Sequence, residues 1–423
     1  MSYQKRILDD SLDALFPHLA AIAIEGAKGV GKTALARRRA RTIYELDDQQ
    51  QRELLGADVD VIRSAEPPVL VDEWQLIPST WDTVRRAVDA DATGGRFLLT
   101  GSANVAPGTR IHSGAGRIVS LRMRPLTMAE RQPGGQTVSL THLLEGTQQE
   151  IQGSTGLRLA DYVDEIVRSG FPGIRTLPDR ARRAQLDGYL SRIVERELPE
   201  AGLMVRRPTM LREWLAAYGA ATASIANYST ILDAATAGIT EKPSRSTVDG
   251  YRDHLQRIFI LDPLPAWTPA FTPLTRLALS PKHHLVDPAL AARLLRIDER
   301  DLLSGGRPDP ALGTESFLGA LFESLVTQSV RVYADAAEAT VGHLRSQDGR
   351  REIDLIVEGP GRRVLAIEVK LAATVSDRDV RHLNWLGTQL GDRLVDRVVV
   401  TTGQYAYRRT DGVAVVPLAL LGP

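Results

Sequence analysis

The residues best suited to chemistry form a phosphate-binding loop with the spacing GxxxxGK(S/T), made of Gly26, Ala27, Lys28, Gly29, Val30, Gly31, Lys32 and Thr33. Glycines let the backbone N–H groups of such a loop turn inward around phosphates, and the amino end of the next helix adds a positive dipole. Lys32 has the reach for the β- and γ-phosphates, and the Thr33 hydroxyl can ligate Mg²⁺. The segment therefore predicts an ATP site that uses Mg²⁺.

The elements on either side of this loop fit that role. The apolar run Leu19–Ile24 precedes the loop and predicts a strand, and the run Ala34–Ala40 after it predicts a helix. A strand–loop–helix order is the context in which this spacing binds phosphate.

Two acids at the end of a second apolar run supply further parts of a hydrolytic site. Residues 67–73 predict an apolar strand that ends in Asp72 and Glu73. Downstream of a phosphate-binding loop, such a pair indicates a Walker B segment. Asp72 would then orient the Mg²⁺ shell, and Glu73 would polarise the attacking water as general base.

A third predicted strand, Arg96–Thr100, ends in small polar residues. Thr100 or Ser102 would place a hydroxyl between the two acids and the γ-phosphate, as a sensor of that phosphate. Further along the chain, Arg117 follows a glycine-rich approach and is a candidate arginine finger, for its own site or for that of a neighbouring subunit. A surface or structural role for Arg117 is the alternative.

The order of these segments resembles AAA-type ATPases of the archaeal-ATPase-like group, which often carry a C-terminal domain of unknown function. The matching segments are GAKGVGKT, VLVDEWQ, FLLTGSAN, and Gly-Arg at 116–117 followed by LRMRPLTMAE. Lys28 departs from the pattern, since the family commonly has arginine there. The resemblance implies a parallel-sheet ATPase core with ATP and Mg²⁺ as cofactors.

The second half of the chain resembles the PD-(D/E)xK nuclease fold. A helix predicted over Gly313–Tyr333 carries Glu323, a strand near 351–357 carries Asp354, and the next strand ends in Glu368 and Lys370. The resemblance implies that Asp354 and Glu368 hold one Mg²⁺, to which Glu323 can add a third carboxylate. Lys370, on the same strand face as Glu368, would then position or deprotonate water. A site used for binding without cleavage, or surface charges alone, are the alternatives, because the hairpin lacks the Pro-Asp pair.

The middle of the chain predicts helices. A long helix over Ala181–Leu198 ends in the charged string 195–197, which we expect to face solvent. Three shorter helices and a strand pair follow, in the order of a winged helix-turn-helix. Its third helix would present Ser244, Arg245, Ser246, Thr247 and Arg252 to nucleic acid. Asp249 and Asp253 on the same helix favour a structural or protein-binding role instead.

Composition sets limits on these interpretations. The chain has 423 residues, a formal net charge of zero and no cysteine, which excludes disulfides, thiolate metal sites and a global basic field. With no apolar signal core at the N-terminus and no long apolar run, we expect a soluble, cytoplasmic protein without membrane contact.

Arginine is the default cation, so each lysine marks a place where a compact ammonium is preferred. The lysines are Lys5, Lys28, Lys32, Lys242, Lys282 and Lys370.

The sequence thus predicts an α/β multidomain chain. Its parts are an ATPase core over 1–150, a helical joint over 151–204, a winged helix over 205–272 and a nuclease-like α/β domain over 273–423, with a linker near 134–156. The first functional hypothesis is Mg²⁺-dependent ATP hydrolysis coupled to the C-terminal domains. The alternatives are an ATP-regulated DNA or RNA nuclease and a nucleotide-gated binding protein with an inactive nuclease fold. ATP and ADP are the expected ligands, and a protein partner or an oligomer is compatible with the sequence.

Overall fold

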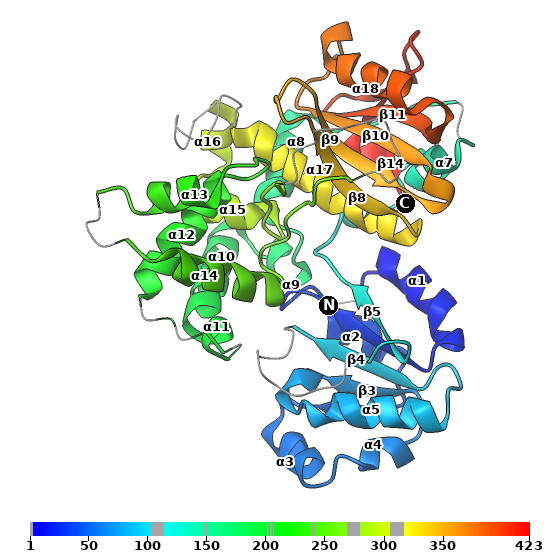
Figure 1. Cartoon of the computed structure of the whole chain (residues 1–423), viewed down its shortest axis with the longest axis vertical. Helices are drawn as coiled ribbons and strands as arrows, with labels where there is room; N and C mark the ends of the chain where they lie inside the picture. The colour runs from blue at the N-terminus through cyan, green and yellow to red at the C-terminus, as the bar shows by residue number, and fades with distance from the viewer. Residues whose placement is uncertain are drawn as a thin grey trace.

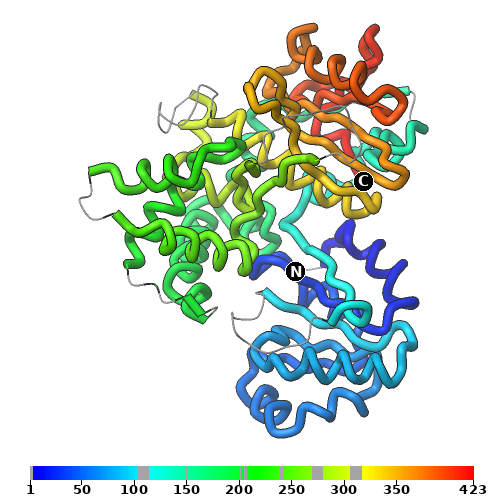
Figure 2. The backbone as a smooth tube through the Cα atoms, in the orientation of Figure 1, coloured from blue at the N-terminus to red at the C-terminus, as the bar shows by residue number. Residues whose placement is uncertain are grey.

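The computed structural model describes residues 3–102, 114–147, 150–200, 202–203, 205, 207–238, 242–268, 280–304 and 317–423. The chain forms three lobes (Figure 1). The N-terminal sheet lies at the bottom, a group of helices coloured green lies at the left, and the C-terminal sheet lies at the upper right. The backbone trace places the N-terminus near the junction of the lobes (Figure 2).

The N-terminal lobe is a five-stranded parallel sheet in the order β2-β3-β4-β1-β5. Its strands are β1 (Ala21–Glu25), β2 (Thr42–Glu45), β3 (Val69–Asp72), β4 (Phe97–Gly101) and β5 (Ile118–Arg122). The helices of this lobe are α1 (Ile7–Leu15), α2 (Lys32–Arg37), α3 (Gln49–Ala57), α4 (Val61–Ser64) and α5 (Ser79–Ala90).

Both faces of this sheet are buried, as parallel sheets require. Ile22 and Ile24 pack into one core with Leu12 of α1 and Leu35 of α2. Residues of the opposite parity, such as Ala23, pack into a second core with helices α3 to α5. The phosphate-binding loop lies at the carboxyl end of β1, between that strand and α2.

The middle lobe is helical, with α8 (Leu159–Arg168), α9 (Pro172–Arg175), α10 (Asp179–Arg192), α11 (Leu198–Glu200), α12 (Pro208–Ala220), α13 (Tyr228–Ala235), α14 (Arg245–Arg257), α15 (Pro288–Leu294) and α16 (Glu299–Ser304). A π-helical turn, Ile193–Glu197, extends α10. Helices α12 to α14 match the three shorter helices predicted from the sequence. After α14, Leu261 bridges to Leu285 and Leu264 to Lys282, in place of the expected strand pair within 258–265. The winged-helix assignment therefore stays a prediction.

The C-terminal lobe is a seven-stranded mixed sheet in the order β7-β12-β13-β11-β10-β9-β8. Its main strands are β8 (Thr340–Arg345), β9 (Glu352–Glu358), β10 (Val364–Lys370), β11 (Leu394–Thr401), β12 (Tyr405–Arg408) and β13 (Ala414–Pro417). Helix α17 (Phe317–Ala336) packs with Leu365 and Ile367 on one face, and α18 (Asp377–Leu390) packs with Val364 and Ala366 on the other. The helix predicted from residue 313 begins at Phe317 in the described part of the chain, and 313–316 lie outside the described residues.

The predicted linker near 134–156 is wrong. This stretch contains β6 (Val138–Ser139), α7 (Leu140–Glu145) and β7 (Gly153–Ser154). Strand β6 pairs with β14 (Leu421–Gly422), and β7 pairs with β12, so the stretch is built into the C-terminal lobe. Its short strands lack the apolar run that marks a strand in a sequence, because they pair at sheet edges. The proposed boundary at 272/273 lies outside the described residues.

Helices that could cross a membrane are not found in the described residues, since none there combines sufficient length with sufficient hydrophobicity.

Candidate functional site

The phosphate-binding loop owes its shape to glycines. Gly31 has a left-handed backbone with φ of 106° and caps α2. At Gly26, a Cβ atom would lie 2.2 Å from the backbone oxygen of Met123, so a larger residue would push the loop away from the segment that directly follows β5. Both positions therefore need glycine, as the loop spacing predicts.

Lys32 lies inside this loop with a side chain almost removed from solvent. Its Nζ donates hydrogen bonds to the backbone oxygens of Gly26 (2.8 Å) and Ala27 (3.0 Å). Burial lowers the pKa of Lys32 to about 8, against the opposing pull of the Glu73 and Asp72 carboxylates. The Lys32 ammonium is thus removed from water, and the negative charge of a bound phosphate would stabilise it.

The Asp72 carboxylate accepts hydrogen bonds from hydroxyl groups on two other elements. Thr33 Oγ1 lies 2.9 Å and 3.1 Å from the two Asp72 carboxylate oxygens, and the Thr100 hydroxyl donates to Oδ1. Strand β4 lies between β1 and β3, so that Thr100 is the register neighbour of both Ile24 and Asp72. The carboxyl edge of the sheet therefore brings together three predicted site residues that are far apart in the sequence.

Glu73 adjoins this cluster at the end of β3. Its backbone is left-handed, with φ of 52°, which is uncommon for a residue with a side chain. Its carboxylate accepts a 2.9 Å hydrogen bond from Ser102 Oγ and a second one from the Gln75 side chain. Of the two candidate sensors, Thr100 thus contacts Asp72 while Ser102 contacts Glu73. The sequence assigns no role to Gln75, although it is the last residue of the VLVDEWQ segment.

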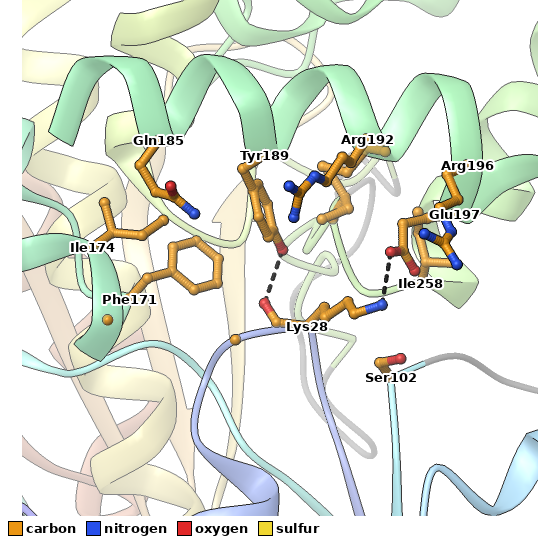
Figure 3. Close-up of a pocket in the computed structure, with 14 residues that line it drawn as sticks. Lys28, Ser102, Phe171, Ile174, Gln185, Tyr189, Arg192, Arg196, Glu197 and Ile258 are labelled. Carbon is orange, nitrogen blue, oxygen red and sulfur yellow. Dashed lines mark hydrogen bonds and ion pairs between the residues drawn. The ribbon is translucent and has the colours of Figure 1, made fainter. Parts of the chain in front are cut away.

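The helical lobe covers the outer side of the loop (Figure 3). Lys28 Nζ lies 2.9 Å from Glu197 Oε1, and the Tyr189 hydroxyl donates to the Lys28 backbone oxygen at 3.1 Å. A cavity of about 290 Å³ lies here, lined by loop residues, by Ser102 and by residues of α10 and the π-helical turn. Arg192 and Arg196 are among its lining residues. The expectation that 195–197 face only solvent is therefore wrong, since Glu197 pairs with the loop.

Arg117 lies away from these residues. It directly precedes β5, whose first residue, Ile118, pairs with Ala21 at the start of β1, so Arg117 sits at the amino edge of the sheet. There its Nε bonds Asp89 at 2.8 Å. The loop lies at the opposite, carboxyl edge, so the structure does not bring Arg117 into the site of its own chain, and a role in a neighbouring subunit remains a prediction.

Arg6 stabilises the phosphate-binding loop by a hydrogen bond to its backbone, a role that the sequence did not predict. Its guanidinium donates to the Val30 backbone oxygen (2.9 Å) and to the Arg124 backbone oxygen (2.8 Å), and it pairs with Glu130 at 2.9 Å. Glu130 also closes a capping box with Thr127 at the start of α6 (Met128–Arg131). The capping pattern was visible in the sequence, but its arginine partner lies 124 residues earlier.

The C-terminal candidate residues also lie together. Asp354 and Glu368 stand on the adjacent strands β9 and β10, and Glu323 projects from α17. Lys370 Nζ lies 2.8 Å from Glu368 Oε1. Burial beside the Asp354 carboxylate raises the pKa of Glu368 to about 8. An unexpected member joins them, because the buried Lys282 ammonium contacts both Glu323 and Asp354.

The predicted nucleic-acid helix, α14, has its polar residues engaged locally. Ser244 caps the helix by accepting from Thr247 N–H. Arg252 pairs with Asp249 and Asp253 at 3.2 Å each and lies over the Tyr228 ring. These contacts favour the structural alternative, and contact between Arg245, Ser246 and nucleic acid stays a prediction.

Three family models match parts of the chain. Residues 19–132 match a model described as an AAA domain, residues 159–301 match the domain of unknown function DUF8612, and residues 318–421 match the domain of unknown function DUF4143. The chain carries an N-terminal AAA domain and a C-terminal DUF4143 domain. This order agrees with the predicted resemblance to archaeal-ATPase-like proteins.

Curated relatives match almost the whole chain. An uncharacterized protein of Mycobacterium tuberculosis is 27% identical over 413 residues, which is 94% of this chain and 79% of the relative. An uncharacterized protein of Mycobacterium bovis matches with the same identity and coverage. Among solved structures, a chain from the structure of Drosophila ORC bound to DNA is 14% identical with a TM-score of 0.19, over 61% of this chain and 90% of that one. A TM-score this low supports no argument about fold or function.

Proposed function

We propose that this protein binds ATP with Mg²⁺ and hydrolyses it. The observation that carries the proposal is the meeting of Thr33, Thr100 and Asp72 at the carboxyl edge of the sheet, directly beside Lys32 and Glu73. These residues come from three separate elements, and each has the type and position that phosphoryl transfer to water needs. The AAA-domain match over 19–132 supports the same activity.

The donor set fits Mg²⁺, a hard cation that prefers oxygen ligands. The Thr33 hydroxyl and an Asp72 carboxylate oxygen lie 2.9 Å apart, so both can face one ion directly or through its water shell. When bound with the nucleotide, Mg²⁺ neutralises phosphate charge. The chain's own residues do the remaining work. Lys32 and the loop N–H groups bind phosphate, and Glu73 accepts a proton from water.

The helical lobe offers a second candidate for a cation at the γ-phosphate. Arg192, the last residue of α10, lines the cavity, and its guanidinium lies beside the Tyr189 ring (Figure 3). We propose that Arg192 contacts the γ-phosphate once the Lys28–Glu197 pair opens. A guanidinium in this place would stabilise charge that develops on the transferred phosphoryl group.

The nucleotide site is joined to the C-terminal lobe by a continuous set of hydrogen bonds. Arg6 links the Val30 oxygen to Glu130 at the start of α6. The Met128 and Ala129 N–H groups of α6 donate to Ser329 and Tyr333 of α17. We propose that nucleotide state moves α17, and with it the DUF4143 domain, because the loop, α6 and α17 share these contacts. A protein or nucleic-acid partner of that domain is a proposal that depends on this coupling.

ATP turnover of purified variants tests the hydrolysis. Lys32→Ala should lose ATP binding, whereas Glu73→Gln should keep binding and lose turnover by at least about a hundredfold, as expected for a general base. Lys5→Ala and Glu53→Gln are matched controls at exposed positions. Full turnover in both site variants would refute the proposed ATPase.

A further inference from the structure

The resemblance to PD-(D/E)xK nucleases implies a divalent cation at Asp354, Glu323 and Glu368, and the structure offers a direct test of that fit. Lys282 Nζ lies 2.8 Å from Glu323 Oε1, 2.9 Å from Asp354 Oδ1 and 3.1 Å from Glu352 Oε1. The ammonium donates hydrogen bonds to Glu323 and Asp354, and the Glu352 carboxylate forms an ion pair with it. One carboxylate oxygen each of Glu323, Asp354 and Glu352 therefore already faces a cation of the chain itself.

The backbone fixes Lys282 in this place. Its N–H and its carbonyl oxygen each form a 2.9 Å hydrogen bond with Leu264, in an antiparallel bridge. The residue is 1% exposed, so its ammonium has no access to bulk water. Burial alone lowers the pKa of Lys282, but the carboxylates of Asp354, Glu323 and Glu352 outweigh it and raise the pKa well above the ordinary value. The side chain therefore stays charged.

The remaining oxygens of the acids do not restore a metal site. Asp354 Oδ2 accepts the Val369 N–H at 2.9 Å, and Glu368 Oε1 faces Lys370 at 2.8 Å. Glu368 Oε2 is buried without a hydrogen-bond partner among the described residues, but it is a single oxygen, whereas Mg²⁺ takes about six ligands. Mg²⁺ binds its oxygen ligands at about 2.1 Å. An ion bound to these oxygens would therefore lie very close to the positively charged Lys282 ammonium, which disfavours its binding. Among the described residues, no group of three His, Cys, Asp or Glu side chains is suited to hold a metal ion. The donor set does not fit the implied cation.

We infer that Lys282 is a permanent internal counter-ion that replaces the divalent cation, so that the C-terminal domain does not cleave phosphodiesters by metal catalysis. The acids then serve to join three elements, since Lys282 ties the bridge segment to α17 and β9. This inference concerns the C-terminal lobe and does not depend on ATP hydrolysis.

Mn²⁺ binding, measured by electron paramagnetic resonance without nucleotide, tests the inference. The full chain carries Asp72→Asn, which removes the carboxylate that the N-terminal site would offer to a metal ion. This protein should give a Mn²⁺ signal that Asp354→Asn leaves unchanged. Adding Lys282→Ala should create a Mn²⁺ site at the freed acids, with affinity at least about tenfold above the background, and Asp354→Asn should remove it again.

A Mn²⁺ site in the Asp72→Asn protein that disappears with Asp354→Asn would overturn the inference. This comparison keeps Lys282 and stands even if Lys282→Ala fails to fold. Thermal unfolding gives a second measurement on Lys282→Met, which fills the same volume. Lys282→Met should lower the melting temperature because it leaves unpaired buried carboxylates, and adding Asp354→Asn and Glu323→Gln should recover part of the loss. No recovery would also count against the inference.

Discussion

Ser102 Oγ donates a 2.9 Å hydrogen bond to the Glu73 carboxylate, which joins the end of β4 to the end of β3. Glu73 holds a left-handed backbone, so this bond and the one from Gln75 fix the direction of its carboxylate. Ser102→Ala should therefore lower kcat for ATP by about tenfold and change KM little, because orientation of the base matters in the transition state more than in binding. Steady-state turnover measures both constants.

Ser120→Ala is the matched control, since Ser120 lies on β5 of the same sheet and bonds Glu25 instead. An equal loss of kcat in both variants would show that the effect is structural rather than tied to Glu73.

The buried position of Lys32 predicts a pH dependence of ATP binding. Its pKa is lowered to about 8, so above that pH the apo protein carries a neutral amine in the loop. Phosphate charge favours the ammonium, so ATP binding above pH 8 should be accompanied by proton uptake. Affinity should fall by up to about tenfold per pH unit there and stay level below it. Calorimetry in two buffers of different ionisation enthalpy measures the uptake.

Lys32→Arg separates this effect from general alkaline changes, because a guanidinium stays charged throughout the range. Weaker but pH-independent binding is expected. If Lys32→Arg shows the same decline as the wild type, Lys32 is not the titrating group.

The two arginine candidates give opposite predictions. Arg192 lines the cavity beside the loop, whereas Arg117 bonds Asp89 at the other edge of the sheet. Arg192→Ala should lower kcat by at least about tenfold at every protein concentration. Arg117→Ala should leave turnover of the isolated chain unchanged. A loss in Arg117→Ala that appears only at high protein concentration would instead support a role in a neighbouring subunit.

The sequence could predict those parts of the site in which one short segment contains both a strand or turn and the functional side chain that it positions. The loop at Gly26–Thr33 and the acids after β3 are of this kind, because strand, turn chemistry and functional side chain are contiguous. Their mutual approach also followed, since parallel strands end at a common edge. Thr100 and Ser102 were found for the same reason, although which acid each one contacts depends on side-chain geometry.

Contacts between distant segments could not be predicted in this way. Arg6 reaches Val30 and Glu130 across the lobe, and Glu197 reaches Lys28 across 169 residues. Lys282 lies 72 residues from Asp354, and no local pattern indicates their contact. One signal existed, because lysine is rare in this chain and Lys282 is one of its few members. The rarity of lysine marks Lys282 as clearly as it marks Lys32 and Lys370.

The Arg6–Glu130 pair yields a prediction for stability. Both side chains are almost fully buried, and Arg6 Nε lies 2.9 Å from Glu130 Oε1. Removing one partner of a buried pair costs about 3–5 kcal/mol, because the other charge stays buried without compensation. Glu130 keeps the N–H groups of Ile7 and Thr127, so Arg6→Ala should destabilise by about 3 kcal/mol, at the lower end of that range. Urea unfolding, monitored through the transition of the N-terminal sheet, measures the change in the free energy of unfolding.

A double variant identifies the origin of this loss. Arg6→Met combined with Glu130→Gln removes both charges and should be less destabilised than the sum of the two single variants, since each single change already breaks the pair. Lys5→Ala should show no measurable change, because its pair with Asp10 is exposed to solvent. Additive losses in the double variant would mean that Arg6 stabilises the protein through the Val30 and Arg124 oxygens alone, and Glu130 would then have no part in holding the loop.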